Sequence, residues 1–167
     1  MKKERLIKTV RLQENLASIR KIAGWTAEDL GELLGVSKQN ISNLENDNTK
    51  LSQAQYVAIR HFLDYQITHN LENTALPLMT HLLLDRLEIV GRDYKSLKDT
   101  AQNIGVAAST MNGETLRIFT ITLLKASYTR VSDLTEINST IKDAIEADES
   151  HDWTADIIGN VLKEDKT

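Results

Sequence analysis

Four polar side chains, spaced so that a helix carries them on one side, have the chemistry to contact a base edge. They are Lys38, Gln39, Ser42 and Asn43. Lysine donates hydrogen bonds to guanine edges or to phosphate. The amides of Gln39 and Asn43 each donate and accept at once, which matches the adenine edge in the major groove. This pattern predicts a surface that reads a DNA sequence.

The helix that carries these side chains is predicted to begin after Ser37, a residue type that caps helix N-termini. Ile41 and Leu44 recur at helical spacing and are expected to face inward, which leaves the four polar residues outside. Gly35 precedes this helix. A glycine there supplies the left-handed conformation that a helix C-terminus commonly needs.

A first short helix is predicted to begin after Thr26, with Asp29 three residues later in a capping-box arrangement. Leu30, Leu33 and Leu34 give this helix an apolar face. Two short helices joined by a tight turn predict a helix-turn-helix. The alternative is a helical hairpin that serves only for packing.

The sequence of residues 30–46, with a predicted helix on either side, closely resembles the XRE (Cro/C1-type) helix-turn-helix family of transcriptional regulators. The resemblance covers roughly residues 10–66 and implies an all-α, lambda-repressor-like bundle whose third helix enters the major groove. It implies that the base-reading residues are Lys38, Gln39, Ser42 and Asn43. The phosphate contacts that it implies are Thr26, Ser37, Asn40, Asn48, Thr49 and Lys50. Ala27 stands where many members carry a glutamine that braces the recognition helix, so we expect that brace to be missing.

Composition is typical of a globular protein in a reducing compartment. The chain has 167 residues, of which 41% are hydrophobic and 26% charged, and it contains no cysteine. No stretch is typical of a signal peptide or a membrane span, so we expect a cytoplasmic protein. The four histidines show no metal-ligand spacing, and no phosphate-binding glycine loop is present. We therefore expect no enzymatic activity, no metal and no cofactor.

Charge is distributed unevenly along the chain, although the formal net charge is -4. Residues 1–60 hold 10 lysines and arginines against 7 acidic residues, whereas residues 61–167 hold 10 against 17. A local basic excess is sufficient for a small DNA-binding module, because phosphate contacts are made by local groups. We expect the acidic remainder not to touch the duplex.

Two further helices are predicted around the motif. The inward positions of the first are Leu12, Leu16, Ile19 and Ala23, with an end at Gly24. Those of the second, capped by Ser52, are Tyr56, Ile59, Leu63 and Ile67. A basic leader precedes them and is either a DNA-contacting arm or a solvated tail; its cations are Lys2, Lys3, Arg5, Lys8 and Arg11.

The polar segment of residues 68–77, which ends at the single proline, predicts a boundary between a DNA-binding domain (1–70) and a helical C-terminal domain (78–167). A leucine-rich helix is predicted over residues 78–90, stopped by Gly91. Residues 96–111 then repeat features of the first motif, with Gly105 aligned on Gly35. A degenerate second helix-turn-helix without a basic reading surface stays open here.

Residues 116–126 are β-branched enough for a strand, but we predict a helix because the segment mirrors the helix after the first motif. Two terminal helices follow in the prediction. The inward positions are Leu134, Ile137, Ile141 and Ile145 in one, and Trp153, Ile157, Val161 and Leu162 in the other. They are candidates for a dimer contact, and packing within the chain is the alternative.

The function indicated is a sequence-specific transcriptional regulator, a repressor that binds a palindromic operator in double-stranded DNA as a homodimer. The alternative is an antitoxin-like or phage-encoded interaction protein. In that case the C-terminal half neutralises a protein partner while the N-terminal half autoregulates. A small-molecule sensor stays open as well.

Overall fold

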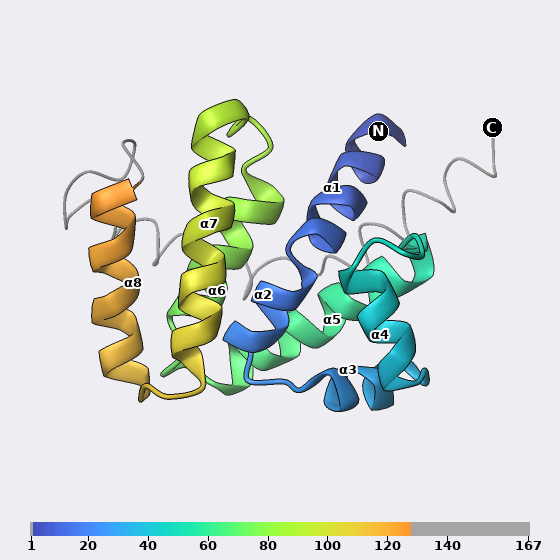
Figure 1. Ribbon diagram of the computed structural model, residues 1–167, viewed down its shortest axis with the longest axis horizontal. Coiled ribbons are helices and arrows are strands. Elements are labelled where there is room, and N and C mark those ends of the chain that lie inside the picture. Colours follow the sequence, from blue (N-terminus) through green and yellow to red (C-terminus); the bar gives the residue numbers. More distant parts are fainter. Residues whose placement is uncertain (1, 128–167) are drawn as a thin grey trace.

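The chain is described by a computed structural model that covers residues 2–127. This part is all helical, as predicted (Figure 1). Its elements are α1 (Lys2–Glu14), α2 (Leu16–Ile22), α3 (Ala27–Leu34), α4 (Lys38–Glu45), α5 (Gln53–His69), α6 (Ala75–Thr80), the π-helical turn η1 (His81–Asp85), α7 (Gly91–Ala108) and α8 (Gly113–Ser127). The expected helices with the Leu134 and Trp153 stripes lie outside the described residues.

The helix predicted from Leu12 to Ala23 is divided into α1 and α2 at Asn15. The Asn15 amide donates to the backbone oxygen of Arg11 at 2.7 Å, and the backbone bends there. All four predicted inward residues of this stretch are buried. The periodicity therefore located the core face, while the break depends on a local side-chain hydrogen bond that competes with the helix.

The basic leader is helical, and its last cation is buried rather than solvated. The Arg11 guanidinium lies 4.3 Å from the centre of the Tyr94 ring and donates to four backbone oxygens. These oxygens belong to Leu83, Arg86, Leu87 and Ile89. Arg11 thus joins α1 to the segment after η1, because it satisfies carbonyls that have no helical partner.

The leucine-rich segment is buried, but it is not the single helix predicted for residues 78–90. It consists of α6 and η1 and ends at Asp85, and Gly91 begins α7 instead of stopping the earlier helix. Pro77 lies in the first turn of α6, where its missing N–H costs no helical hydrogen bond. The segment from Ala75 to Thr80 is fully buried.

No second helix-turn-helix exists at residues 96–111, and that alternative was wrong. These residues continue α7 without a turn up to Ala108, and Gly105 keeps a right-handed helical conformation. A Cβ at Gly105 would lie 3.4 Å from the backbone oxygen of Ser18 and 3.4 Å from the Cβ of Lys21. The glycine therefore permits close packing of α7 on α2, not a turn. The helix predicted at residues 116–126 is confirmed as α8.

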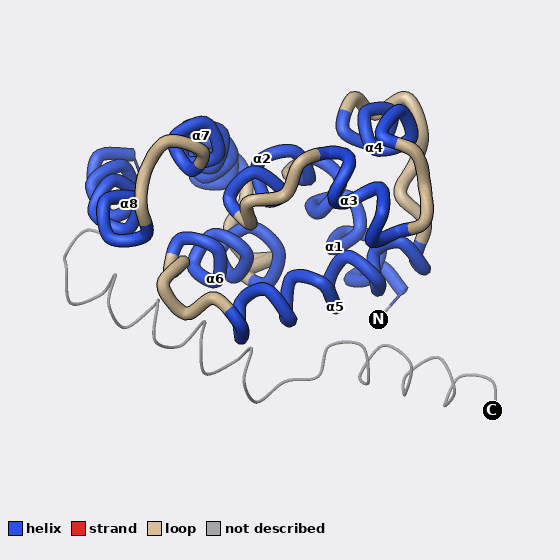
Figure 2. Tube along the Cα trace, turned by 90° about the horizontal axis from the view of Figure 1, so that it is seen from below, coloured by secondary structure: helices blue, strands red, loops and turns tan. Residues whose placement is uncertain are grey.

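One hydrophobic core runs through the described residues. It contains Leu16 and Ile19 of α2, Leu63 of α5, Leu83 of η1 and Ile104 of α7. Figure 2 shows α2 between the α3–α4 pair and α7. The division into domains 1–70 and 78–167 stays a prediction, and the helices on its two sides share this core.

The two aligned glycines should respond oppositely to alanine. Gly35→Ala should lower the free energy of unfolding by about 1–2 kcal/mol, because Gly35 has φ 69° and a Cβ disfavours that region. Gly105→Ala should leave it unchanged or raise it by up to about 1 kcal/mol, because alanine favours a helix. Urea denaturation followed by circular dichroism measures both. Equal losses would contradict the assignment of Gly105 to a helix interior.

Candidate nucleic-acid interface

The α3–turn–α4 unit is held by the two caps and the glycine predicted for it. The Thr26 hydroxyl accepts from the Asp29 N–H at 3.0 Å, and the Asp29 carboxylate accepts from the Thr26 N–H at 2.7 Å. That backbone hydrogen bond, followed by the one with the hydroxyl, lowers the pKa of Asp29. Ser37 caps α4 by accepting from the Asn40 N–H at 3.2 Å, and Gly35 is left-handed.

Packing between α3 and α4 depends on a second glycine. A Cβ at Gly31 would lie 2.7 Å from the backbone oxygen of Val36, so only glycine allows the turn to pass this close. Leu30, Ile41 and Leu44 are buried as predicted. Leu33 differs from the prediction: it is 43% exposed, because the short helix turns only part of its apolar stripe toward the core.

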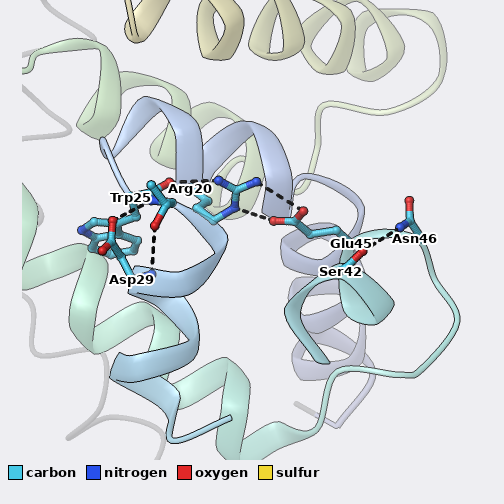
Figure 3. Close-up of polar contacts among 7 residues, drawn as sticks. Arg20, Trp25, Asp29, Ser42, Glu45 and Asn46 are labelled. Atoms are coloured by element: carbon cyan, nitrogen blue, oxygen red, sulfur yellow. Dashed lines mark hydrogen bonds and ion pairs between the residues drawn. The ribbon is translucent and has the colours of Figure 1, made fainter. Parts of the chain in front are cut away.

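The four predicted base-reading residues lie on the side of α4 away from the core. Lys38 and Gln39 are exposed, and Ser42 and Asn43 are half-buried. The Gln39 amide donates to the Asn43 side-chain oxygen at 3.2 Å, and Ser42 accepts from the Asn46 amide at 3.3 Å (Figure 3). The structure thus brings together the set that could face a major groove, and contact with DNA stays a prediction.

The predicted phosphate contacts border this surface. All six are exposed: Thr26, Ser37, Asn40, Asn48, Thr49 and Lys50. The first three lie at the N-termini of α3 and α4, where backbone N–H groups favour anions. The others belong to the loop after α4, in which the N–H groups of Asn48 and Thr49 donate to the Asn43 backbone oxygen. Lys50 pairs with Asp47 at 2.7 Å.

Sequence reasoning missed Gln13, which fixes this loop from α1. Its side-chain nitrogen donates to the backbone oxygens of Leu44 at 3.0 Å and Thr49 at 2.6 Å, and its oxygen accepts from the Leu51 N–H at 3.0 Å. Gln13 is buried beside Leu12, and this position at the edge of an apolar stripe was the available signal. The chain segments that it joins were not readable from spacing.

Sequence reasoning also missed the ion pair between Arg20 and Glu45. The guanidinium contacts the carboxylate with Nε at 2.6 Å and Nη2 at 3.3 Å, and its Nη1 donates to the Trp25 backbone oxygen at 2.9 Å (Figure 3). The two side chains are only 11% and 14% exposed. The pair joins α2 to the end of α4, so α4 is braced although Ala27 offers no amide. Bidentate contacts of this kind also fix orientation.

Other kinds of site find no support in the described residues. Among residues 2–127, no three His, Asp or Glu side chains gather where they could hold a metal ion. Within the same range, no helix combines the length and apolar character needed to cross a membrane. His61 and His69 are exposed, and His81 lies 3.8 Å from Asp85.

Removing one member of the α2–α4 ion pair should destabilise the protein. Arg20→Met should lower the free energy of unfolding by about 2–3 kcal/mol, because it leaves the largely buried Glu45 without its partner. The double variant Arg20→Met/Glu45→Met should recover most of this loss, because no unpaired charge then remains. Urea denaturation measures all three proteins. Additive losses in the double variant would show that the two side chains do not act as a pair.

Comparison with known proteins agrees with this geometry. A family model described as Helix-turn-helix matches residues 16–69, which include α2 to α5. Comparisons with curated proteins and with solved structures found no significant match. Residues 16–69 of this chain therefore form a helix-turn-helix domain of the XRE family, a family of DNA-binding regulators of transcription.

Proposed function

We propose that this protein is a cytoplasmic transcriptional repressor, without catalytic activity, that binds a palindromic operator as a homodimer. The observation that carries the proposal is the outward side of α4. It presents one lysine, two amides and a hydroxyl: Lys38, Gln39, Asn43 and Ser42. These groups match the donors and acceptors of base edges in a major groove.

Electrostatics on this surface supports a DNA partner despite the negative total charge. Glu45 is the single acidic residue of α4, and Arg20 neutralises it at the end away from Lys38. Asp47 in the next loop is paired with Lys50. The base-facing side of α4 therefore carries a positive charge without an opposing carboxylate, and the N-termini of α3 and α4 add partial positive charge for phosphates.

The dimer in this proposal is formed through the isoleucine stripe with Ile137 and Ile141, which lies outside the described residues. A two-fold dimer places two recognition helices about one helical turn of DNA apart. Sedimentation of the intact chain tests this state. A dimer is expected, with dissociation to a monomer in the variant Ile137→Asp/Ile141→Asp at unchanged helix content.

Selection of bound duplexes from a random pool tests the proposed function directly. The expected result is an inverted repeat whose half-sites lie about 10 base pairs apart from centre to centre. A single unrepeated site would contradict the palindromic operator. A pool without enrichment would contradict sequence-specific binding altogether.

Base contacts and phosphate contacts should separate in two variants. Gln39→Ala should weaken operator binding by about 1–3 kcal/mol with little change on random DNA, because it removes an amide from a base edge. Lys50→Ala should weaken binding to both, and should reduce the slope of log affinity against log salt by about 0.9 for each half-site. Fluorescence anisotropy titrations measure both effects.

Two exposed residues distant from α4 in sequence serve as matched controls for these variants. Asn103→Ala removes an amide and Lys3→Ala removes a lysine charge, and each should leave the operator preference unchanged. If Gln39→Ala lost the same affinity on operator and random DNA, its assignment to base reading would be wrong.

A further inference from the structure

Helix α7 is held in a fixed position against the helix-turn-helix domain. At one end the Tyr94 hydroxyl donates to Glu14 at 2.7 Å and accepts from the Asn15 amide at 3.0 Å. Further along, Gly105 lets α7 approach α2 at Ser18. Because both contacts involve residues directly before or within α2, the position of α7 relative to α4 is set by the fold.

The exposed sides of α4 and α7 point in the same general direction. Figure 1 shows both helices at the front of the molecule, and Figure 2, turned by 90°, shows both along one edge with α5 and α6 behind them. A hollow of about 490 Å³ lies between α1, the loop after α4, and α7. Lys50 of that loop and Lys98 of α7 both line this hollow. A cation of α7 therefore adjoins a predicted phosphate contact.

The outward surface of α7, which we call the α7 polar face, consists of Arg92, Lys95, Lys98, Asp99, Gln102 and Asn103. Their spacing places them on one broad side of the helix, opposite the buried Leu97 and Ala101. Three of the six are cations, two are amides and one is a carboxylate. Lys98 lies 3.7 Å from Glu14, whereas no carboxylate among residues 2–127 forms an ion pair with Lys95. Cations and amides together are the groups that contact phosphate oxygens.

We propose that the α7 polar face binds the phosphate backbone of the duplex, beside the half-site that α4 reads, through Lys95 and Lys98. This inference rests on the proposed function and extends the interface beyond residues 16–69. It replaces the expectation that the chain after residue 60 avoids the duplex. The acidic excess of that part is concentrated in residues 128–167, where 10 acidic residues oppose 4 basic ones. The average charge therefore conceals the local positive surface on α7.

Neutralising these lysines in the full chain tests the proposal. Lys95→Gln and Lys95→Gln/Lys98→Gln should reduce the slope of log affinity against log salt by about 0.9 for each lysine removed in one protomer. The reduction should be the same on operator and random duplexes, because phosphates carry no sequence information. Arg117→Gln, which removes an exposed cation from α8, is the matched control and should change neither slope.

Thermal melting separates contact from folding, because Lys98 also pairs with Glu14. Lys95→Gln breaks no ion pair within residues 2–127, so its melting temperature should equal that of the wild type. Its changed salt slope then reports a lost phosphate contact. A slope equal to that of Arg117→Gln in both the single and the double variant would overturn the proposal.

The absence of cysteine allows a positional test as well. Single cysteines replacing Lys95, Gln39 or Arg117 can each be labelled with a photo-crosslinker in the full chain. Crosslinks to a duplex are expected from positions 95 and 39 and not from position 117. Crosslinks from position 39 alone would overturn the proposal, and would assign the α7 polar face to another partner such as an acidic protein. If no position crosslinks and the wild type binds no duplex, the proposed function itself fails.

Discussion

The burial of α2 on two sides is the constraint on which the rest of this structure depends. One side of α2 carries Arg20, which binds Glu45 at the end of α4, and another carries Ser18, against which Gly105 of α7 packs. Leu16, Ile19 and Ile22 fill the core between these contacts. A displacement of α2 would therefore disturb both the recognition helix and α7, since interiors are close-packed and transmit strain.

Helix α4 is short, so its position depends on polar contacts as well as on apolar burial. Ile41 and Leu44 anchor one side of it. Gln13 fixes its last turn and the following loop, while Ser37 closes its beginning. These contacts are made by residues other than the outward set, so the side chains of Lys38 and Gln39 stay exposed. A rigid support with an exposed reading face is what binding without large rearrangement requires.

Arg11 extends the same logic to the chain beyond α5. Its guanidinium satisfies four backbone oxygens at the end of η1 and lies against the Tyr94 ring. The irregular segment between η1 and α7 can therefore be buried next to α1 without unpaired carbonyls, which would be costly in the core. Through this contact and the Tyr94–Glu14 hydrogen bond, α7 becomes part of the surface beside the helix-turn-helix.

Features that depend on neighbouring residues were determined by the sequence alone. The caps at Thr26, Ser37 and Ser52, and the left-handed Gly35, follow from bonds and conformations within about four residues. Periodicity likewise located most buried positions, although it placed Leu33 too far inward. The outward set on α4 was predictable for the same reason, because helical spacing fixes which residues oppose Ile41 and Leu44.

Features that depend on distant partners were decided only by the tertiary structure. Arg20 meets Glu45 across 25 residues and Arg11 meets Ile89 across 78, and no local pattern specifies such pairs. The two aligned glycines illustrate the limit most clearly. Gly35 and Gly105 occupy similar sequence contexts, yet one ends a helix and the other lies inside one. The packing of α7 on α2 needs a residue without a side chain at Gly105, and that demand comes from the neighbouring helix, not from the local sequence.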